Sequence, residues 1–180
     1  MMSGVAQTVS VMEEKIIVKE GNSRSLLDSL DIFLLVGQSN MAGRAPIEPV
    51  DSDSLDGVYL FNGFNWEKAA NPLNKYSTVR KDIALQRLGP GYSFAKKLSS
   101  VTGRKIGLVV NALGGTSIAQ WQKGYSWQSD FDLFEQALSQ VEMTGGKALI
   151  KGIIWHQGES DQNNPTIYMD DINMLSAFFC

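Results

Sequence analysis

The sequence predicts an α/β domain in which a mainly parallel sheet lies between two layers of helices. Short apolar segments of strand length alternate along the chain with segments whose apolar residues have helical spacing. The first apolar segment, residues 32–36, has no polar position, which is typical of a strand that is buried on both faces. Three of the predicted strands run into polar turns that contain glycine, as at the ligand-binding edge of a doubly wound sheet.

The predicted elements follow from these patterns in order. Strands are expected at residues 32–36, 58–61, 106–110 and 148–155, and helices around residues 92–98, ending at Gly103, and around residues 131–141, ending at Gly145-Gly146. Residues 1–30 have weak periodicity and are expected to form a flexible N-terminal arm, so that the domain comprises residues 31–180. Residues 62–90 are polar and are expected to form an irregular loop at the rim of a binding site.

Composition and charge exclude several classes of function. The chain has 180 residues and a net charge of −3, and its basic residues are scattered, so we expect neither nucleic acid nor a membrane as a partner. No apolar segment approaches the length of a membrane span, and the first thirty residues lack the pattern of a secretory signal, which favours a cytoplasmic location. Cys180 is the single cysteine, so we expect no internal disulfide and no zinc site, and no cofactor is predicted.

The turn after the first strand presents a serine. Gly37 ends the apolar segment, and Gln38, Ser39 and Asn40 follow at a place where backbone amides are free to bind a ligand. Ser39 would then lie at the mouth of a crevice. The alternative is an ordinary strand-to-helix turn in which Ser39 caps the next helix, and the local sequence does not separate the two.

Two further turns supply complementary groups. The third predicted strand is followed by the paired glycines Gly114 and Gly115, and the fourth runs into a turn that contains Gln157. A serine, a glycine amide and a side-chain amide are the parts of a nucleophile with an oxyanion hole. A phosphate-binding loop is disfavoured, because no lysine follows the glycines with the spacing of a P-loop.

Three motifs together resemble the sequence blocks of the SGNH (GDSL-type) hydrolases. They are Gly37-Gln38-Ser39-Asn40-Met41-Ala42-Gly43, Gly114-Gly115-Thr116-Ser117-Ile118 and Trp155-His156-Gln157-Gly158-Glu159-Ser160-Asp161. The resemblance covers about residues 31–161 and is closest to plant-type carbohydrate esterases related to acetylxylan and sialate O-acetylesterases. It implies a three-layer α/β/α, flavodoxin-like hydrolase that removes O-acetyl groups from an acetylated carbohydrate.

The resemblance also implies the site residues. Ser39 would be the nucleophile, and the oxyanion would be held by the backbone amides of Ser39 and Gly115, or its neighbour Gly114, together with the side chain of Gln157. Gln157 stands where many members of the superfamily have asparagine. The residues expected in supporting positions are Gln38, Asn40, Glu159 and Asp161.

A catalytic base is the part of the pattern that these residues do not supply. The resemblance implies a histidine near the carboxyl end with an aspartate three residues before it, but the one histidine is His156, for which strand alternation favours a packing or rim role. The sequence therefore looks like a C-terminally truncated esterase that lacks the last strand and the catalytic loop, with Ser39 a weak nucleophile and residues 148–155 at an open sheet edge. The alternative function is a non-catalytic carbohydrate-binding or regulatory fragment of such an esterase.

Several other side chains have two interpretations. Trp121, Tyr125 and Trp127 could form a platform on which a sugar stacks, or they could belong to the core. Arg44 and Arg80 could contact an acidic sugar or only solvent.

Overall fold

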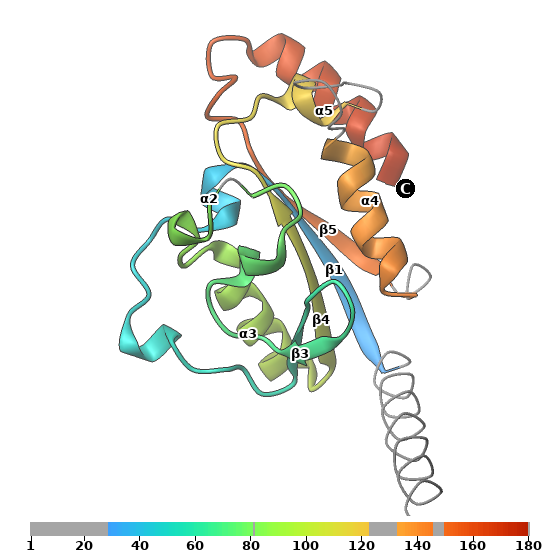
Figure 1. Cartoon of the computed structure of the whole chain (residues 1–180). Helices are drawn as coiled ribbons and strands as arrows, with labels where there is room; N and C mark the ends of the chain where they lie inside the picture. Colours follow the sequence, from blue (N-terminus) through green and yellow to red (C-terminus); the bar gives the residue numbers. More distant parts are fainter. Residues whose placement is uncertain (1–28, 81, 123–132, 146–149, 180) are drawn as a thin grey trace, which may run out of the picture.

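The computed structural model describes residues 29–80, 82–122, 133–145 and 150–179, and its centre is a five-stranded sheet (Figure 1). The strands are β1 (Leu30–Gly37), β2 (Val58–Phe61), β3 (Trp66–Lys68), β4 (Lys105–Ala112) and β5 (Ile150–His156), in the spatial order β3-β2-β4-β1-β5. All neighbours pair in parallel except β2 and β3. The predicted mainly parallel sheet is confirmed. The predicted arm, except residues 29 and 30, lies outside the described residues.

Strand β1 is an interior strand of the sheet, with β4 on one side and the edge strand β5 on the other. Its register places Leu30 opposite Lys105 in β4 and Gly37 opposite His156 in β5. Every β1 side chain except Phe33 is buried, which confirms the prediction of a strand covered on both faces. Because β1, β4 and β5 run in parallel, their carboxyl ends meet at one edge of the sheet, where the three predicted turns begin.

The helices cover both faces of the sheet. They are α2 (Ser39–Ala42), α3 (Pro90–Thr102), α4 (Leu133–Met143) and α5 (Pro165–Phe179), with short 3₁₀ helices η1 (Pro49–Asp51), η2 (Leu73–Tyr76), η3 (Ile83–Leu85) and η4 (Ile118–Trp121). Helix α3 begins at Pro90 and ends where Gly103 takes a left-handed conformation, with φ of 66°. The two predicted helices are thus confirmed, whereas α5 lies outside the predicted elements.

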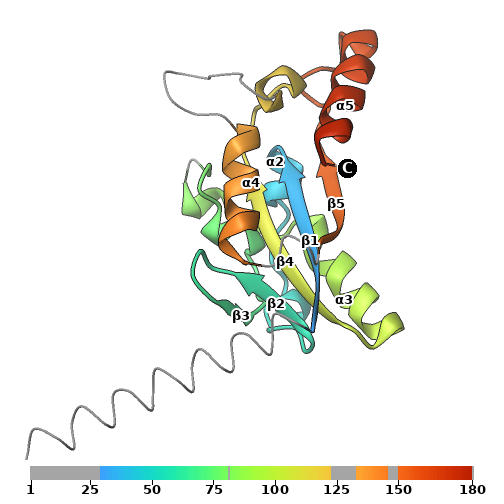
Figure 2. The same cartoon turned by 90° about the vertical axis from the view of Figure 1, so that its right-hand side faces the viewer.

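Alternating side chains of β1 belong to two separate cores. Leu34 packs in a cluster with Leu133 and Ala137 of α4, whereas Leu35 packs in a second cluster with Tyr92 of α3. Figure 2 shows α4 and α3 on opposite faces of the sheet. This arrangement gives the three layers that the sequence predicts.

The hairpin of β2 and β3 corrects one prediction. Residues 66–68 pair antiparallel with β2, although the sequence predicts an irregular loop over residues 62–90. The turn of the hairpin is closed by Asn62, whose Oδ1 accepts hydrogen bonds from the backbone N–H groups of Phe64 at 3.1 Å and Asn65 at 2.9 Å. A three-residue strand is too short to show an alternating pattern, so periodicity misses it.

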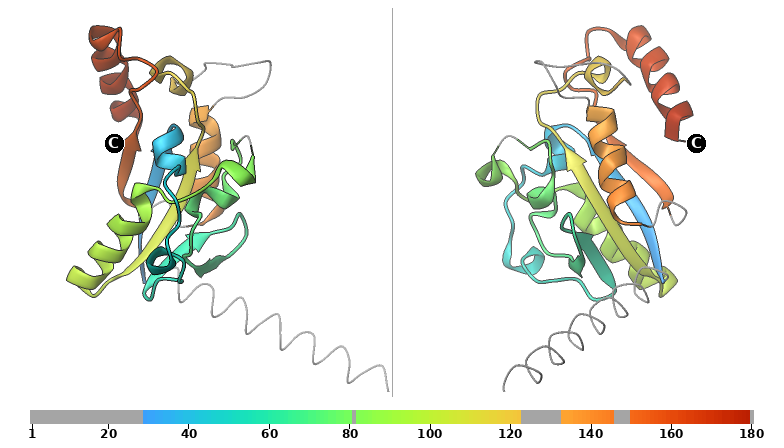
Figure 3. Two further views of the ribbon diagram at one scale, coloured as in Figure 1. Left: turned by 90° about the vertical axis from the view of Figure 1, so that its left-hand side faces the viewer. Right: turned by 45° about the vertical axis from the view of Figure 1, so that its right-hand side comes forward.

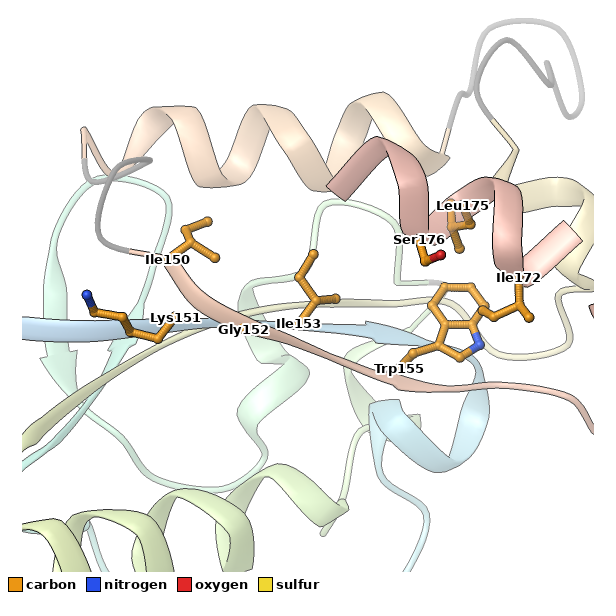
Figure 4. Close-up of a pocket in the computed structure, with 8 residues that line it drawn as sticks. All are labelled: Ile150, Lys151, Gly152, Ile153, Trp155, Ile172, Leu175 and Ser176. Carbon is orange, nitrogen blue, oxygen red and sulfur yellow. The ribbon is translucent and has the colours of Figure 1, made fainter. Parts of the chain in front are cut away.

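The two edges of the sheet are formed by β5 and by the hairpin (Figure 3). No β5 side chain is fully buried. An apolar cavity of about 510 Å³ lies between β5 and α5, and Figure 4 shows Ile150, Ile153 and Trp155 on the same side of β5, with Trp155 beside Ile172 and Leu175 of α5. The expectation that this strand is poorly covered agrees with the structure. Within the described residues, no helix has the length and apolar character needed to cross a membrane.

Candidate active site

Ser39 is the first residue of α2, directly beyond the carboxyl end of β1. The turn that carries it is held by both neighbouring strands: Gln38 N–H donates to the carbonyl oxygen of His156, and Leu113 N–H donates to that of Gly37, each at 3.0 Å. A Cβ on Gly37, where φ is 142°, would lie 2.1 Å from the carbonyl oxygen of His156. Glycine is therefore required for the strand ends to approach this closely.

The side chain of Ser39 does not cap a helix. The N-cap position of α2 is occupied by Gln38, and no side chain caps it. Ser39 is half-buried, and its hydroxyl has no hydrogen-bond partner among the described residues. The alternative in which Ser39 serves only as a cap is therefore wrong, and its hydroxyl is free to meet a ligand.

The second predicted turn lies against Ser39. A Cβ on Gly114 would be 3.4 Å from the Cβ of Ser39, which is ordinary van der Waals contact, so the two residues lie side by side. Gly115 has a positive φ of 80°, and its backbone N–H has no acceptor among the described residues. Ser39, Gly114 and Gly115 line one cavity of about 280 Å³ with Arg44, Arg80, Leu85, Gln86 and Ala112. The structure thus brings together the predicted nucleophile and both predicted glycines.

A buried asparagine that the sequence analysis misses holds the end of β4. The Asn74 side chain accepts a hydrogen bond from Ala112 N–H and donates one to the Ala112 carbonyl oxygen, both at 3.0 Å. Its Nδ2 also donates to Oε1 of Gln86 at 2.8 Å. Asn74 therefore continues the pairing of β4 beyond the sheet and fixes the start of the glycine turn. Nothing in its local sequence marks this role, because both of its partners are distant in the chain.

Gln157, the predicted side-chain donor to the oxyanion, is buried and engaged elsewhere. Its Nε2 donates to the Thr116 carbonyl oxygen at 2.9 Å and to the Asp161 carboxylate at 2.5 Å. Both of its amide hydrogens are used, and Gln157 does not line the cavity of Ser39. Its side chain instead links the second turn, through Thr116, to the third turn, through Asp161.

The predicted supporting residues all lie at the junction of the three turns. Gln38 is buried, and its Oε1 accepts a hydrogen bond from Ser160 Oγ at 3.0 Å. Asn40 Nδ2 donates to Glu159 Oε1, and both side chains are exposed. Asp161 accepts hydrogen bonds from Gln157 and from a backbone N–H of η4.

Electrostatics differ between the two sides of this junction. On the α5 side, burial raises the pKa of the Asp171 carboxyl, and the negative charges of Asp161 and Asp170 raise it further. On the other side, Arg44 Nη1 donates to the carbonyl oxygens of Gly43 at 2.7 Å and Leu85 at 2.9 Å, which fixes its guanidinium at the cavity.

The structure also shows where the aromatic candidate Trp121 and the single histidine lie. Trp121 is fully buried, forms a T-shaped contact with Trp155 and donates from Nε1 to Thr116 Oγ1, so the sugar-stacking interpretation is wrong for this residue. Tyr125 and Trp127 lie outside the described residues.

His156 is exposed at the end of β5, as expected for a rim residue. In the described part of the chain, no three His, Cys, Asp or Glu side chains are grouped so that they could hold a metal ion.

The cavity of Ser39 and the cavity between β5 and α5 differ in chemistry. The larger one, between β5 and α5, is lined mainly by apolar side chains and contains neither glycine turn. The smaller one holds a serine, two arginines and the backbone of both glycines. Polar groups that converge beyond the ends of parallel strands identify the smaller cavity as the candidate active site.

Comparisons with known proteins show the family to which the chain belongs. A family model described as "Carbohydrate esterase, sialic acid-specific acetylesterase" matches residues 29–178. A probable carbohydrate esterase from Arabidopsis thaliana is 33% identical over 153 residues, which cover 72% of this chain and 54% of that protein. The chain thus spans about half the length of this curated relative.

Solved structures show the same fold. The X-ray structure of that Arabidopsis thaliana protein superposes with a TM-score of 0.68 at 29% identity, covering 82% of this chain and 66% of the other. The crystal structure of a carbohydrate acetylesterase from Xanthomonas citri superposes with a TM-score of 0.58 at 23% identity, covering 83% of this chain and 37% of the other. Since the family model matches most of the chain, this protein belongs to the carbohydrate esterase family of sialic acid-specific acetylesterases, an SGNH-type family.

Proposed function

We propose that Ser39 is the nucleophile of an ester hydrolase that removes O-acetyl groups from carbohydrate. The observation that carries this proposal is the free Ser39 hydroxyl, which lies against Gly114 in a cavity at the meeting point of three strand ends. A serine with no structural hydrogen bond, in a polar crevice, is suited to nucleophilic attack. The family and the curated relative, a probable carbohydrate esterase, support a sugar ester as the substrate.

The proposed reaction has two steps. Ser39 Oγ attacks the acetyl carbonyl carbon and the Ser39 hydroxyl loses its proton, while the bond from that carbon to the sugar oxygen breaks and the sugar oxygen takes up a proton, which leaves an acetyl group on Ser39. Water then attacks this ester, one of its protons returns to Ser39 Oγ, and acetate is released. Each step passes through a tetrahedral intermediate whose negative oxygen requires hydrogen-bond donors.

Two backbone amides are available for the oxyanion. The N–H groups of Ser39 and Gly115 have no acceptor among the described residues, and both belong to residues that line the cavity. Gln157 would contribute a third donor only after its amide turns away from Thr116 or Asp161. We therefore assign the oxyanion hole first to the two backbone groups, with Gln157 as a further donor in the substrate complex.

The base sets the level of activity. The 180 residues contain no Asp-x-x-His pair, and the single histidine lies exposed at the end of β5. We expect slow hydrolysis by these residues alone, because a serine hydroxyl needs a proton acceptor. Two observations favour a second candidate function, that of a non-catalytic carbohydrate-binding or regulatory fragment. The 180 residues contain no Asp-x-x-His pair, and both amide hydrogens of Gln157 are engaged.

Hydrolysis of 4-nitrophenyl acetate tests the proposal. The chain is compared with Ser39→Ala, with Ser93→Ala on the exposed face of α3 as the matched control, and with a version extended by a related C-terminal segment that carries Asp-x-x-His. We expect the extension to raise the rate and Ser39→Ala to return it to the background, with Ser93→Ala unchanged. If the extended chain and its Ser39→Ala variant are equally active, Ser39 is not the nucleophile. If the extended chain shows no activity above background, the non-catalytic function is favoured.

A further inference from the structure

Strand β5 pairs with β1 along one side, and its other side is an open edge of the sheet (Figure 3). Among the described residues, the backbone of residues 150–155 forms no hydrogen bond other than those with β1. Free N–H and C=O groups in a row, beside apolar side chains, are a template on which another strand can pair. The open edge of β5 is therefore a candidate docking surface.

The regular part of this edge is short and has a defined centre. The register with β1 shifts after Ile150, so that Lys151 is left unpaired and the regular ladder covers residues 152–156. Ile154 is the middle residue of that segment. Two copies of one strand that pair antiparallel about a twofold axis use their full length only when their middle residues lie opposite each other. Self-pairing of β5 thus has one best register, with Ile154 at the axis.

The side chains match in this register. Ile153 of one copy comes opposite Trp155 of the other on the face that α4 covers, and Ile154 meets its own copy on the face of α3. Aromatic and β-branched residues that lie opposite each other stabilise an antiparallel pair. Ile153, Ile154 and Trp155 are all only half-buried in the single chain. Pairing would remove apolar surface of these residues from water, which favours association.

The two ends of the segment carry opposite charges. Lys151 is exposed directly before it, and Glu159 is exposed in the turn that follows it. Within the described part of the chain, Lys151 forms no ion pair, and Glu159 accepts one hydrogen bond, from Asn40. Antiparallel pairing brings the start of each strand beside the end of the other, so each Lys151 approaches the acidic turn of the other copy. Parallel pairing would instead place lysine beside lysine.

We propose that β5 pairs antiparallel with β5 of a second copy of this chain, about a twofold axis at Ile154, so that two five-stranded sheets become one continuous sheet. The cavity of Ser39 contains no residue of β5, so it stays open in the dimer. Because the regular segment is short, we expect a reversible dimer and not a permanent one.

A cysteine at the twofold axis tests the register. In a chain whose native thiol is removed by Cys180→Ser, Ile154→Cys should form a disulfide between two copies on mild oxidation. Facing residues of an antiparallel pair have Cα atoms about 4.5–5.5 Å apart, which is within the range of a disulfide. Lys151→Cys is the control, because its two copies would lie roughly 20 Å apart. Equal cross-linking at both positions, or none at Ile154→Cys, overturns the proposal.

Sedimentation velocity of the 180-residue chain at increasing concentration tests the dimer itself. Lys151→Glu and Glu159→Lys should each weaken association about tenfold, because each places like charges together at both ends of the pair, and the double variant should restore it. Lys97→Glu makes the same charge change on the exposed side of α3 and should have no effect. Thermal unfolding shows whether each variant is folded.

Three results would overturn the second copy as the occupant of this edge. One is a chain that stays monomeric at every concentration. Another is an equal loss of association in Lys97→Glu and Lys151→Glu. The third comes from hydrogen exchange: if the outward amides of residues 152–156 are protected to the same degree in the dilute monomer, a segment of the same chain covers the edge.

Discussion

The buried side-chain amide of Gln157 donates a hydrogen bond to the carboxylate of Asp161 at 2.5 Å. The same carboxylate accepts a hydrogen bond from the backbone N–H of Ile118 at 2.8 Å. One acidic side chain in the third turn thus holds both its own turn and the start of η4, next to the glycine turn. The alignment of the two turns depends on this carboxylate.

Replacement of Asp161 by asparagine should therefore weaken the hydrogen bonds that join the two turns and destabilise the fold. Both hydrogen bonds end on Asp161 Oδ2, so the amide oxygen of an asparagine can still accept them but without the negative charge that strengthens them, and we expect the free energy of unfolding to fall by about 1 kcal/mol. Urea unfolding followed by fluorescence measures the change. Asp53→Asn, at an exposed position, is the control and should be neutral. Equal stability of the two variants would show that Asp161 does not hold the turns together.

Gly37→Ala should be among the most damaging single substitutions. The new Cβ would lie 2.1 Å from the carbonyl oxygen of His156, in addition to the strain of a positive φ. Gly63→Ala is a matched control, because Gly63 also has a positive φ, 96°, but a Cβ there would meet nothing within 4 Å. In urea unfolding, we expect the free energy of unfolding to fall by at least about 3 kcal/mol in Gly37→Ala and by about 1 kcal/mol in Gly63→Ala. Similar losses would mean that the strand ends separate easily.

Asn74→Ala should weaken both the fold and the cavity. It leaves the N–H and the carbonyl oxygen of Ala112 without their partner in a buried position, which we expect to cost about 2 kcal/mol or more. In the extended chain the rate of 4-nitrophenyl acetate hydrolysis should fall as well, because the Gly114-Gly115 turn starts at this point. Asn65→Ala, on the exposed hairpin turn, should change neither quantity. A stable and fully active Asn74→Ala variant would show that β4 needs no such support.

The ion pair between Asp31 and Arg104 should make stability depend on pH. Hydrogen bonds from Arg104, of which the one from Nη2 is 2.6 Å long, together with its charge, hold the pKa of the buried Asp31 carboxyl below its ordinary value of 3.8. Since the folded-state pKa is lowered, this contribution is present above that value and is lost as the pH falls through the folded-state pKa. The difference in unfolding free energy between the chain and Asp31→Asn should therefore be largest near neutral pH and shrink below pH 4.

Asp56→Asn is the control for that pH series. Asp56 pairs with Lys68 at 2.9 Å, but both side chains are largely exposed, so we expect no measurable change at any pH. A loss in Asp31→Asn that stays constant from pH 7 to pH 3 would assign the effect to packing and not to the ion pair.

The features that the sequence predicted correctly are those with a local cause. Apolar segments identified β1, β2, β4 and β5, and Gly103 marked the end of α3 because a left-handed residue there favours glycine. The serine and glycine turns were found because each follows directly on a buried strand. The position of Ser39 against Gly114 then follows from parallel strands ending at one edge.

What the sequence did not predict depends on contacts between distant residues. Asn74 reads as an ordinary polar residue of a loop until β4 is placed beside it, and β3 exists because β2 offers it an edge. The partners of Gln157 come from another turn and from four residues further along the chain. Trp121 is a core residue because η4 packs against α4 and α5, where the Trp121 ring meets that of Trp155 from β5.

The position of β1 between β4 and β5 also determines when its pairs can form during synthesis. Leu30 must wait for Lys105 before it has a partner strand, and Ile32 must wait for Ile150. A nascent chain that has emerged only as far as α3 therefore carries its most apolar strand with neither neighbour. Formation of the β1 pairs is delayed until β4 and then β5 have been synthesised, and an apolar strand that stays exposed during that interval is prone to aggregation.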